Sequence, residues 1–263
     1  MTTDGTQAPQ VHVTTEGGVA TLTLDSPANR NALSSALLAQ LLDAVAAAVA
    51  DEAVRVIVLS HAGPVFSSGA DLRETAAALR GEEVPVARLG DVLVAIWESP
   101  KPIVARVGGP ARAGGLGLIA AADIAVCDEQ ATFAFSEVRL GVIPAVISAT
   151  VLPRMHPRAA TELYLTGEAF DGRRAAQVGL VSAAVPAADL DATVEAHVAA
   201  LRQGAPGALA AAKELLRRTP GSIRDDLAEL TALSVRFFTS DEGREGVRAF
   251  GEKRPPSWVR SMK

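Results

Sequence analysis

The sequence is poor in cysteine and in aromatic residues. A single cysteine, Cys127, occurs among the 263 residues, so the chain forms no internal disulfide, and the preceding apolar run predicts a buried thiol. Aromatic side chains make up 4% of the chain, and the 49% hydrophobic content is carried mainly by Ala, Val and Leu. These absences argue against a disulfide-stapled secreted domain and predict a reducing compartment, the cytoplasm.

Basic stripes and long apolar runs are absent as well. The formal net charge is -5 and the basic residues are dispersed, so no surface for nucleic acid is predicted. No apolar run reaches the roughly 20 residues that span a bilayer, and the first residues lack the pattern of a signal peptide. We therefore expect no nucleic-acid or membrane partner, although local charge still permits an anionic small molecule.

Motifs that define the common cofactor and metal sites are also missing. The glycines between Gly108 and Gly117 do not satisfy G-x-G-x-x-G, and neither a P-loop nor a G-x-S-x-G elbow occurs. The four histidines lack the spacing of metal ligands, and we expect surface or turn positions for all of them: His12, His61, His156 and His197. The sequence therefore predicts no metal.

The order of the expected strands and helices predicts an α/β fold. Alternating residues predict a hairpin of strands at 11–13 and 19–24, and Ser34 or Ser35 can cap a helix over residues 37–49. A β-branched run predicts the next strand at 54–60, which favours sequential parallel pairing. Further helices and one strand are expected at residues 145–155, 158–165, 170–179 and, for the strand, 180–185.

The most informative stretch runs from residue 101 to residue 141. It predicts a buried strand at 102–107, a glycine-rich turn, a short apolar helix opening near Gly114, a strand at 124–127 and one acidic side chain, Glu137, on a loop. The first N–H groups of a helix are unpaired and lie at the positive end of its dipole. They can therefore hold an oxygen that carries or develops negative charge.

A second turn of the same kind follows the strand at 54–60. Residues 61–72 are rich in Gly, Pro and Ser and lead into a helix that we expect from about Asp71. Such connections occur in every α/β protein, so this one alone is more typical of scaffold than of a site. If the N–H groups of the two turns converge, they form a two-donor oxyanion hole.

The chain beyond Pro186 is helical in pattern throughout. Helices are expected at residues 190–201, 207–217, 222–240 and 241–250. An apolar stripe in the third suits either the core or a subunit contact, and we favour the core: Ile223, Leu227, Leu230, Phe237 and Phe238. We divide the chain into an α/β core, residues 1–200, and a helical C-terminal oligomerisation region, residues 201–263.

Eight short motifs follow one another in a specific order along nearly the whole chain. They are residues 31–33 (NAL), 54–59 (VRVIVL), 66–72 (FSSGADL), 101–103 (KPI), 113–115 (AGG), 122–124 (ADI), 136–141 (SEVRLG) and 252–254 (EKR). Their order and spacing resemble the enoyl-CoA hydratase/isomerase (crotonase) family. The resemblance implies a spiral of ββα units with a helical C-terminal region, assembly as trimers or dimers of trimers, and an acyl-CoA thioester substrate.

The resemblance also implies roles for single residues. The thioester oxygen would lie between the backbone N–H groups of Ala70 and Gly114, with Glu137 as the catalytic acid/base. The implied substrate-binding positions are Ser68, Asp71, Arg112, Gly117 and Lys253. Arg112 would hold a distal substrate carboxylate and Lys253 would meet CoA phosphates, whereas Arg30 is more typical of a surface charge. Coenzyme A is then part of the substrate, and no separate cofactor is implied.

One position departs from the family's hydratases. They usually carry a second glutamate where this chain has Gly117, and a single acid/base also suits the Δ3,Δ2-enoyl-CoA isomerases. Residues 113–118 and 136–148 are similar to the bacterial methylglutaconyl-CoA hydratase branch of leucine breakdown, which tends to lack that glutamate as well. We favour a hydratase for a branched or carboxylated enoyl-CoA, with the isomerase and a non-catalytic acyl-CoA-binding protein as alternatives. Gly117 is expected to leave space for substrate or water.

Overall fold

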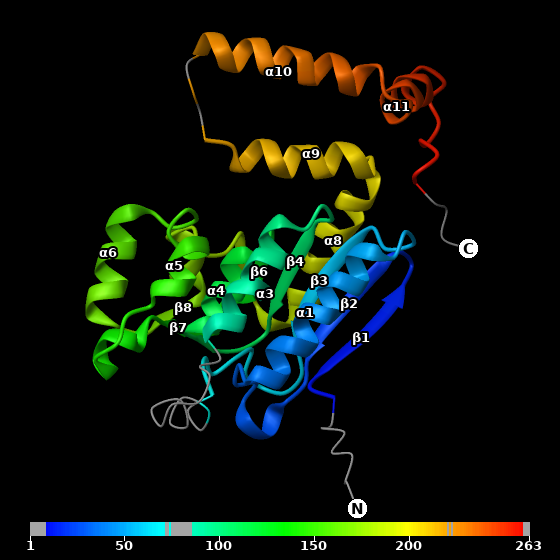
Figure 1. The fold of residues 1–263 in the computed structure, drawn as a ribbon. Helices are drawn as coiled ribbons and strands as arrows, with labels where there is room; N and C mark the ends of the chain where they lie inside the picture. Colours follow the sequence, from blue (N-terminus) through cyan, green and yellow to red (C-terminus); the bar gives the residue numbers. More distant parts are fainter. Residues whose placement is uncertain (1–8, 72–73, 75–85, 220, 222, 260–263) are drawn as a thin grey trace, which may run out of the picture.

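The computed structural model describes residues 9–71, 74, 86–219, 221 and 223–259, and a six-stranded sheet forms its centre (Figure 1). The strands, in spatial order, are β1 (Val11–Glu16), β2 (Val19–Leu24), β3 (Val56–His61), β4 (Ile103–Val107), β6 (Ile124–Asp128) and β9 (Ala183–Val185). β1 and β2 form an antiparallel hairpin, and every later neighbour pairs in parallel. The predicted α/β class and the sequential parallel pairing are confirmed.

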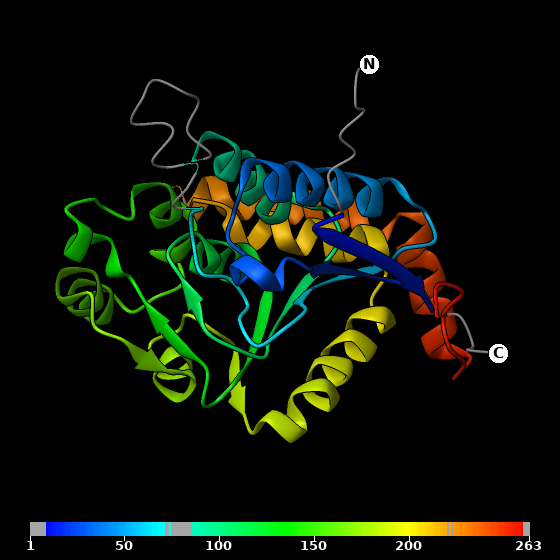
Figure 2. The same ribbon diagram turned by 90° about the horizontal axis from the view of Figure 1, so that it is seen from below.

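Helices cover both faces of this sheet (Figure 2). α1 (Ser35–Ala50) and α3 (Val86–Glu98) lie on one face and contact each other, and α8 (Leu190–Gln203) lies on the other. α1 begins where Ser34 Oγ accepts a hydrogen bond from the Leu37 N–H at 3.2 Å, so the predicted cap is Ser34. α8 buries Val194 and Val198 against the valines of β3, β4 and β6. Both faces of the parallel strands are therefore apolar, as buried parallel sheets require.

A second, three-stranded sheet lies beside the first and was not predicted. It consists of β5 (Ala111–Arg112), β7 (Thr132–Ala134) and β8 (Phe170–Asp171), strands of two or three residues that are too short to give a period-two pattern. Phe133, Phe135 and Phe170 gather here, with ring centroids 5.8 Å and 6.0 Å from that of Phe170. Few as they are, the aromatic side chains thus concentrate at one sheet.

Four further helices surround this second sheet. They are α4 (Gly114–Ala121), α5 (Ala145–Val151), α6 (Pro157–Thr166) and α7 (Gly172–Gln177), with the 3-10 helix η2 (Ser136–Leu140) between β7 and α5. α4 is buried along its whole length and packs against α3 and α5. Cys127 is buried as predicted, and burial raises the pKa of its thiol to about 12, so this thiol is chemically inert at neutral pH.

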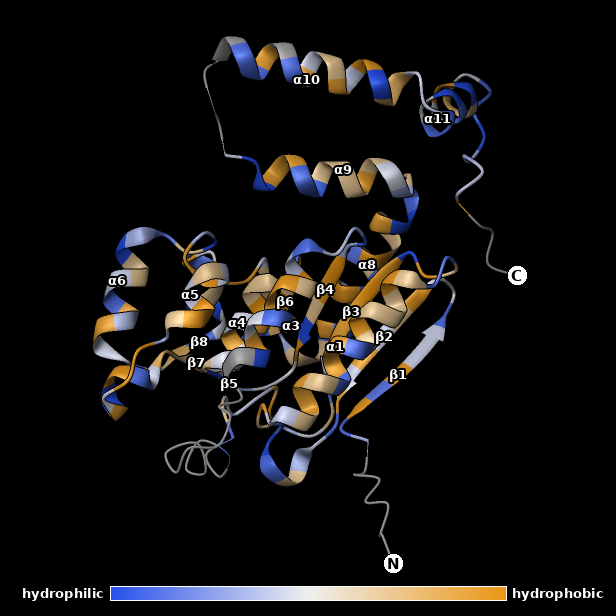
Figure 3. Cartoon of the chain, in the orientation of Figure 1, coloured by the Kyte–Doolittle hydropathy of each residue, from blue (hydrophilic) through white to orange (hydrophobic). Residues whose placement is uncertain are grey.

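The C-terminal helices are α9 (Pro206–Arg217), α10 (Ile223–Phe238) and α11 (Asp241–Gly251), which extend away from the sheets (Figures 1 and 3). α9 is held to the core where Asp123 pairs with Lys213 at 2.6 Å and Arg217 at 3.0 Å. The apolar stripe of α10 was predicted to be core, which is wrong within one chain, because Leu227 is 58% exposed and Phe238 68% exposed. The division at residue 200 stays a prediction.

Three smaller predictions, two of element boundaries and one of the position of His61, were wrong. A fourth concerns a helix that lies mostly outside the described residues. The strand expected at 180–185 is limited to β9, and the helix expected at 145–155 ends at Val151, before a turn that precedes Pro157. His61 was expected at the surface or in a turn, yet it is buried at the end of β3, where its Nε2 accepts a hydrogen bond from Gly108 N–H at 3.0 Å. The helix expected from Asp71 lies mostly outside the described residues.

Candidate active site

The two glycine-containing turns lie directly against each other. Ser67 and Ala111 form a parallel bridge, and the Arg112 N–H donates to Ser67 O at 3.0 Å. A Cβ built on Gly69, whose φ is +91°, would lie 2.9 Å from the Cβ of Ala113. Only glycine permits both this φ and this close approach. The two turns therefore lie side by side, as an oxyanion hole would require.

Each turn supplies one N–H group that no described residue accepts. Gly114 is the first residue of α4, so the helix offers its N–H no carbonyl partner. The Ala70 N–H likewise donates no hydrogen bond within the described part of the chain. Ala113, just before α4, has φ 47° and ψ −118°, a backbone conformation that is strained for alanine. This strained turn sets the direction in which the Gly114 N–H points.

A largely apolar cavity of about 280 Å³ lies at these two turns. Its described lining comes from both turns, from residues 33 and 38 near the start of α1, from α3, from η2 and from the segment that leads into α5. These residues are Leu33, Leu38, Ala70, Leu89, Ala113, Gly114, Glu137, Val142, Ile143, Pro144, Ala145, Val146 and Ile147. Both unpaired N–H groups and Glu137 thus belong to residues that line one cavity.

Glu137 is the only described acidic residue that lines the cavity. It lies in η2 and not on an irregular loop as predicted, because residues 136–140 close into a 3-10 helix that ends at Gly141 with φ +74°. Its Oε2 atom is buried and has no hydrogen-bond partner. Burial in these apolar surroundings raises the pKa of the Glu137 carboxyl above its ordinary value. A carboxyl of this kind suits proton transfer.

The neighbouring helix α6 fixes the position of η2. Arg139 Nε donates to Thr166 O at 3.0 Å, and the ring of Tyr164 lies 4.5 Å from that of Phe135, the residue that precedes η2. The pKa of the Tyr164 hydroxyl is raised by burial and, to a smaller extent, by the charge of Glu137. The buried face of α6 therefore supports the segment that carries the carboxylate.

The other predicted site residues lie outside the described lining of this cavity. Ser68 Oγ donates to Asn29 O, in the 3-10 helix η1 (Pro27–Asn29), and Asp71 accepts from the Glu74 N–H at 3.4 Å. The Arg112 guanidinium donates to Thr132 O and, at 3.0 Å, to Thr132 Oγ1, so it joins β5 to β7. Lys253 follows α11, which lies well away from α5 in both views (Figures 1 and 2). Their substrate-binding roles stay predictions.

Gly117 requires a correction, because the space expected beside it is occupied. A Cβ built on Gly117 would lie 2.6 Å from Ile147 Cγ2 and 3.4 Å from Leu93 Cδ2. The glycine therefore lets α4 and α5 approach closely and does not leave room for substrate or water. Ile147 lines the cavity and Gly117 does not.

The apolar wall of the cavity was missed from the sequence. Residues 145–155 were expected as a helix and residues 136–148 carried a resemblance, but neither segment was assigned to the cavity. Leu33 was named only as part of a motif. A signal was present, because six apolar residues, 142–147, follow Glu137 within ten positions and would be carried past its side chain by the short connection into α5. The contribution of Leu33 and Leu89 depends on tertiary packing that no local pattern shows.

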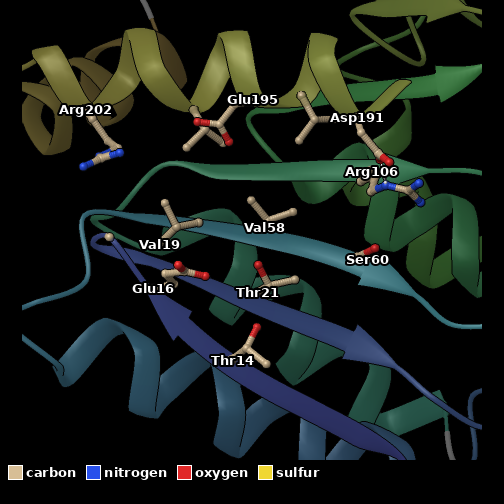
Figure 4. A pocket seen from close by; sticks show the side chains of 13 residues that line it. Thr14, Glu16, Val19, Thr21, Val58, Ser60, Arg106, Asp191, Glu195 and Arg202 are labelled. Carbon is tan, nitrogen blue, oxygen red and sulfur yellow. Dashed lines mark hydrogen bonds and ion pairs between the residues drawn. The ribbon is translucent and has the colours of Figure 1, made fainter. Parts of the chain in front are cut away.

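A second cavity, of about 380 Å³, lies between the outer face of β1 to β4 and α8 (Figure 4). Its lining mixes four valines with polar side chains, among them the hydroxyls of Thr14, Thr21 and Ser60 on the strands, and we call it the polar cavity. Glu16 and Glu195 approach it from β1 and α8, and Arg106 Nε pairs with Asp191 at 2.5 Å. Asp191 and Val194, near the start of α8, line it as well, and the Asp191 carboxylate is paired with Arg106. The apolar cavity is therefore the better candidate for chemistry.

Neither a metal cluster nor a membrane-spanning helix is found among the described residues. The part of the chain that the structure describes holds no cluster of three or more His, Cys, Asp or Glu side chains that suits a metal ion. None of the described helices combines the length and the hydropathy that crossing a bilayer requires.

The fold and the cavity together define an α/β protein with two backbone donors beside one buried carboxyl. Residues 14–261 match the family described as enoyl-CoA hydratase/isomerase, and the chain belongs to this family of enzymes. It is 34% identical to the 2,3-dehydroadipyl-CoA hydratase of Escherichia coli over 244 residues, which cover 90% of this chain and 93% of the relative.

Solved structures give the same assignment. An enoyl-CoA hydratase from Mycobacterium avium is 44% identical, with a TM-score of 0.72 and coverage of 96% of this chain and 100% of that chain. An enoyl-CoA hydratase from Shewanella pealeana is 32% identical, with a TM-score of 0.89 and coverage of 96% and 97%. The crotonase-like fold that the sequence motifs implied is confirmed.

Proposed function

We propose that this enzyme adds water to the double bond of a 2-enoyl-CoA thioester. The observation that carries the proposal is the shared cavity, whose lining holds Glu137, a half-buried carboxyl with a partnerless Oε2 atom, together with Ala70 and Gly114, whose N–H groups are unpaired. A thioester oxygen between the two N–H groups would be stabilised as negative charge develops on it. Glu137 would exchange the protons.

The reaction needs one acid/base residue and no metal. The Glu137 carboxylate takes a proton from water, the water oxygen bonds to the β-carbon, and the double-bond electrons move onto the thioester oxygen. The two N–H groups hold the resulting enolate. Glu137, now protonated, returns the proton to the α-carbon as the enolate electrons form the new C–H bond. A raised pKa makes both transfers accessible near neutral pH.

The lining of the cavity supports an apolar acyl group. Apart from Glu137, its described side chains are those of Leu, Val, Ile, Ala and Pro residues. A carboxylated substrate such as 3-methylglutaconyl-CoA would need a cation at the distal end, and Arg112 is engaged by Thr132. The Escherichia coli relative is named for a carboxylated substrate, so the carboxylated class stays the alternative, with Arg112 released from Thr132 to bind it.

The second candidate reaction is the shift of a double bond from position 3 to position 2. It is favoured by the single carboxyl, because one base that removes the α-proton and returns it to the γ-carbon is sufficient. The packed contact between Gly117 and Ile147 supports this candidate equally, since it leaves no room for a second acid/base at that position.

One assay separates the two reactions and the binding-only alternative. The enzyme is incubated with crotonyl-CoA, 3-methylglutaconyl-CoA and 3-hexenoyl-CoA while the absorbance of the conjugated enoyl thioester is followed. Hydration lowers this absorbance with the first two substrates and gives a 3-hydroxyacyl-CoA by mass spectrometry. Isomerisation raises it with the third. Binding without either change contradicts the proposal and supports a non-catalytic acyl-CoA-binding protein.

We also propose that the active form is a trimer or a dimer of trimers. The exposed apolar side chains of α10 and α11 support it, namely Leu227, Val235, Phe238, Val247 and Phe250. Because α11 lies far from the cavity in one chain, contact of Lys253 with CoA phosphates would come from a neighbouring copy. Light scattering at micromolar concentration tests this, and a monomer contradicts it. The single buried thiol supports a reducing compartment, the cytoplasm.

A further inference from the structure

The side chains that line the cavity differ between two levels along one face of α4. Gly114 and Gly117 are three residues apart, so they lie on the same face of the helix. At the level of Gly114, a built Cβ would meet Leu33 Cδ1 at 2.6 Å and Leu89 Cδ2 at 3.1 Å, and both leucines line the cavity. At the level of Gly117, it would meet Ile147 and Leu93, of which only Ile147 lines the cavity.

Ile147 therefore forms part of the cavity wall at the level of Gly117, about one helical turn along α4 from Gly114. Three residues advance an α-helix by about 4.5 Å, which is the distance along α4 between the proposed oxyanion donor and this wall. The side chain is 3% exposed and fills the contact between α4 and α5. An acyl chain whose carbonyl is held at Gly114 and which extends along α4 reaches Ile147 within a few carbon atoms.

The wall is held in place from several sides. Thr150 Oγ1 lies 3.2 Å from Gly117 O and 3.1 Å from Ile147 O, so its hydroxyl ties α5 to α4 at the same level. Isoleucine in a helix has one strongly preferred χ1 rotamer because it is β-branched. Gly117 lies directly against the Ile147 side chain, and Leu93 lies near the same position.

We propose that Ile147 is the residue that limits acyl-chain length in this enzyme, and that the preferred substrates are straight enoyl-CoA thioesters of four to six carbons. The proposal rests on the acyl-CoA reaction proposed above. Ile147 does not exchange protons or hold the oxyanion. It determines specificity by occupying the volume that a longer chain would need.

The test compares two truncations of buried side chains that both pack against Gly117. Ile147→Ala removes the wall, and Leu93→Ala removes a side chain that is also 3% exposed but does not line the cavity. kcat/KM is measured with 2-enoyl-CoA substrates of four, six, eight and ten carbons, and thermal unfolding checks that both variants are folded. A single methylene in an apolar pocket changes kcat/KM by roughly 10- to 200-fold, so the ratio of the eight-carbon to the four-carbon value should rise at least tenfold in Ile147→Ala. In Leu93→Ala it should change by less than about threefold on the same scale.

A binding measurement keeps this inference separate from the proposed reaction. Titration calorimetry with the saturated butanoyl-CoA and octanoyl-CoA requires no turnover, and only Ile147→Ala should gain affinity for octanoyl-CoA relative to butanoyl-CoA. If no variant turns over any enoyl-CoA but this shift is seen, the proposed reaction fails and the role of Ile147 stands. An unchanged ratio in Ile147→Ala, or an equal shift in Leu93→Ala, overturns the inference about Ile147. Absence of any acyl-CoA binding overturns both.

Discussion

The polar cavity beside α8 and the apolar cavity at Glu137 differ in whether their carboxylates are paired with a cation. In the polar cavity the carboxylate of Asp191 pairs with Arg106, and hydroxyl groups line the strands (Figure 4). In the apolar cavity one carboxyl, Glu137, is buried with an oxygen that has no partner. A charge that is paired on a hydrated surface contributes little to stability or chemistry. A carboxyl without a partner in apolar surroundings costs folding free energy and gains a pKa suited to proton transfer.

The comparison predicts the largest effect for Glu137→Gln. The substitution keeps the shape of the side chain and removes its ability to take a proton, so kcat should fall by roughly 10²- to 10⁴-fold. Binding of a saturated acyl-CoA should stay nearly unchanged, because the carboxyl acts on the reacting carbons and not on coenzyme A. Steady-state kinetics and calorimetry measure the two quantities.

The matched control is Glu168→Gln, which changes an exposed glutamate two residues beyond α6. It should retain the activity of the unsubstituted enzyme. If Glu137→Gln were as active as this control, the acid/base would have to be another residue.

The next effect concerns the N–H of Gly114. Gly114→Pro removes the donor and adds a Cβ near Leu33 Cδ1, whereas Gly114→Ala adds the same Cβ and keeps the N–H. Loss of one oxyanion donor costs about 2.7–4 kcal/mol of transition-state stabilisation, so the proline variant should be roughly 10²- to 10³-fold less active than the alanine variant. Circular dichroism verifies that both fold. Equal activity of the two would show that crowding by the Cβ, and not the donor, matters at this position.

A smaller effect on kcat/KM is expected when the pH is lowered. Glu137 must be ionised to accept a proton, so kcat/KM should fall about tenfold per pH unit below its pKa, with the midpoint above the ordinary glutamate value of 4.5. Between pH 4.5 and the raised pKa, the native state binds more protons at Glu137 than the unfolded chain does. The free energy of unfolding therefore decreases as pH rises through that range. The residual activity of Glu137→Gln should lack this acid limb.

The pKa shift of His61 has the opposite effect on stability. Protonation of His61 at low pH favours unfolding, which would also lower the measured activity. Burial and, to a smaller extent, the charge of Arg106 lower the pKa of His61 below 6.5 in the native state. As pH falls, the unfolded chain therefore binds a proton at His61 before the native state does. The stabilisation from neutral His61 is complete above about pH 6.5 and is lost as pH falls toward the lowered pKa. Fluorescence recorded at each assay pH separates the two effects. A midpoint at or below 4.5 in folded enzyme would contradict the buried state of Glu137.

Local chemistry explains which parts of the fold the sequence could predict. The strands β2, β3 and β4 are β-branched runs, and Ser34 provides a cap in sequence as in structure, so these elements follow from residues that contact their own neighbours. The turn glycines also predicted that the two turns lie close together, and Ala70 and Gly114 do line one cavity; their role as oxyanion donors stays a prediction. Strands of two residues, such as β5 and β8, carry no such signal and depend on contacts with distant residues, as where Arg112 of β5 donates to Thr132 of β7.

The interpretation of Gly117 failed because it depended on a distant residue. A glycine in an apolar helix predicts either open space or a close neighbour, and only the position of Ile147, thirty residues later, decides between them. The stripe of α10 failed in a related way. Its apolar spacing predicts a covered face, but within this chain Leu227 and Phe238 are exposed, and local spacing does not show which element would cover such a face.

The smallest effect is expected in the polar cavity, where Asp191→Asn removes the partner of Arg106. The pair is close, at 2.5 Å, but Asp191 is 78% exposed and Arg106 28% exposed, so water and salt screen most of its attraction. A double-mutant cycle with Arg106→Gln should give a coupling of about 0–1 kcal/mol in urea unfolding, decreasing with added salt. kcat/KM with the preferred enoyl-CoA should stay within about twofold, because no group of this pair reaches the reacting carbons. A tenfold loss of activity in Asp191→Asn, without a change in unfolding, would mean that the polar cavity takes part in the reaction, and the distinction between paired and unpaired carboxylates would no longer identify the active site of this enzyme.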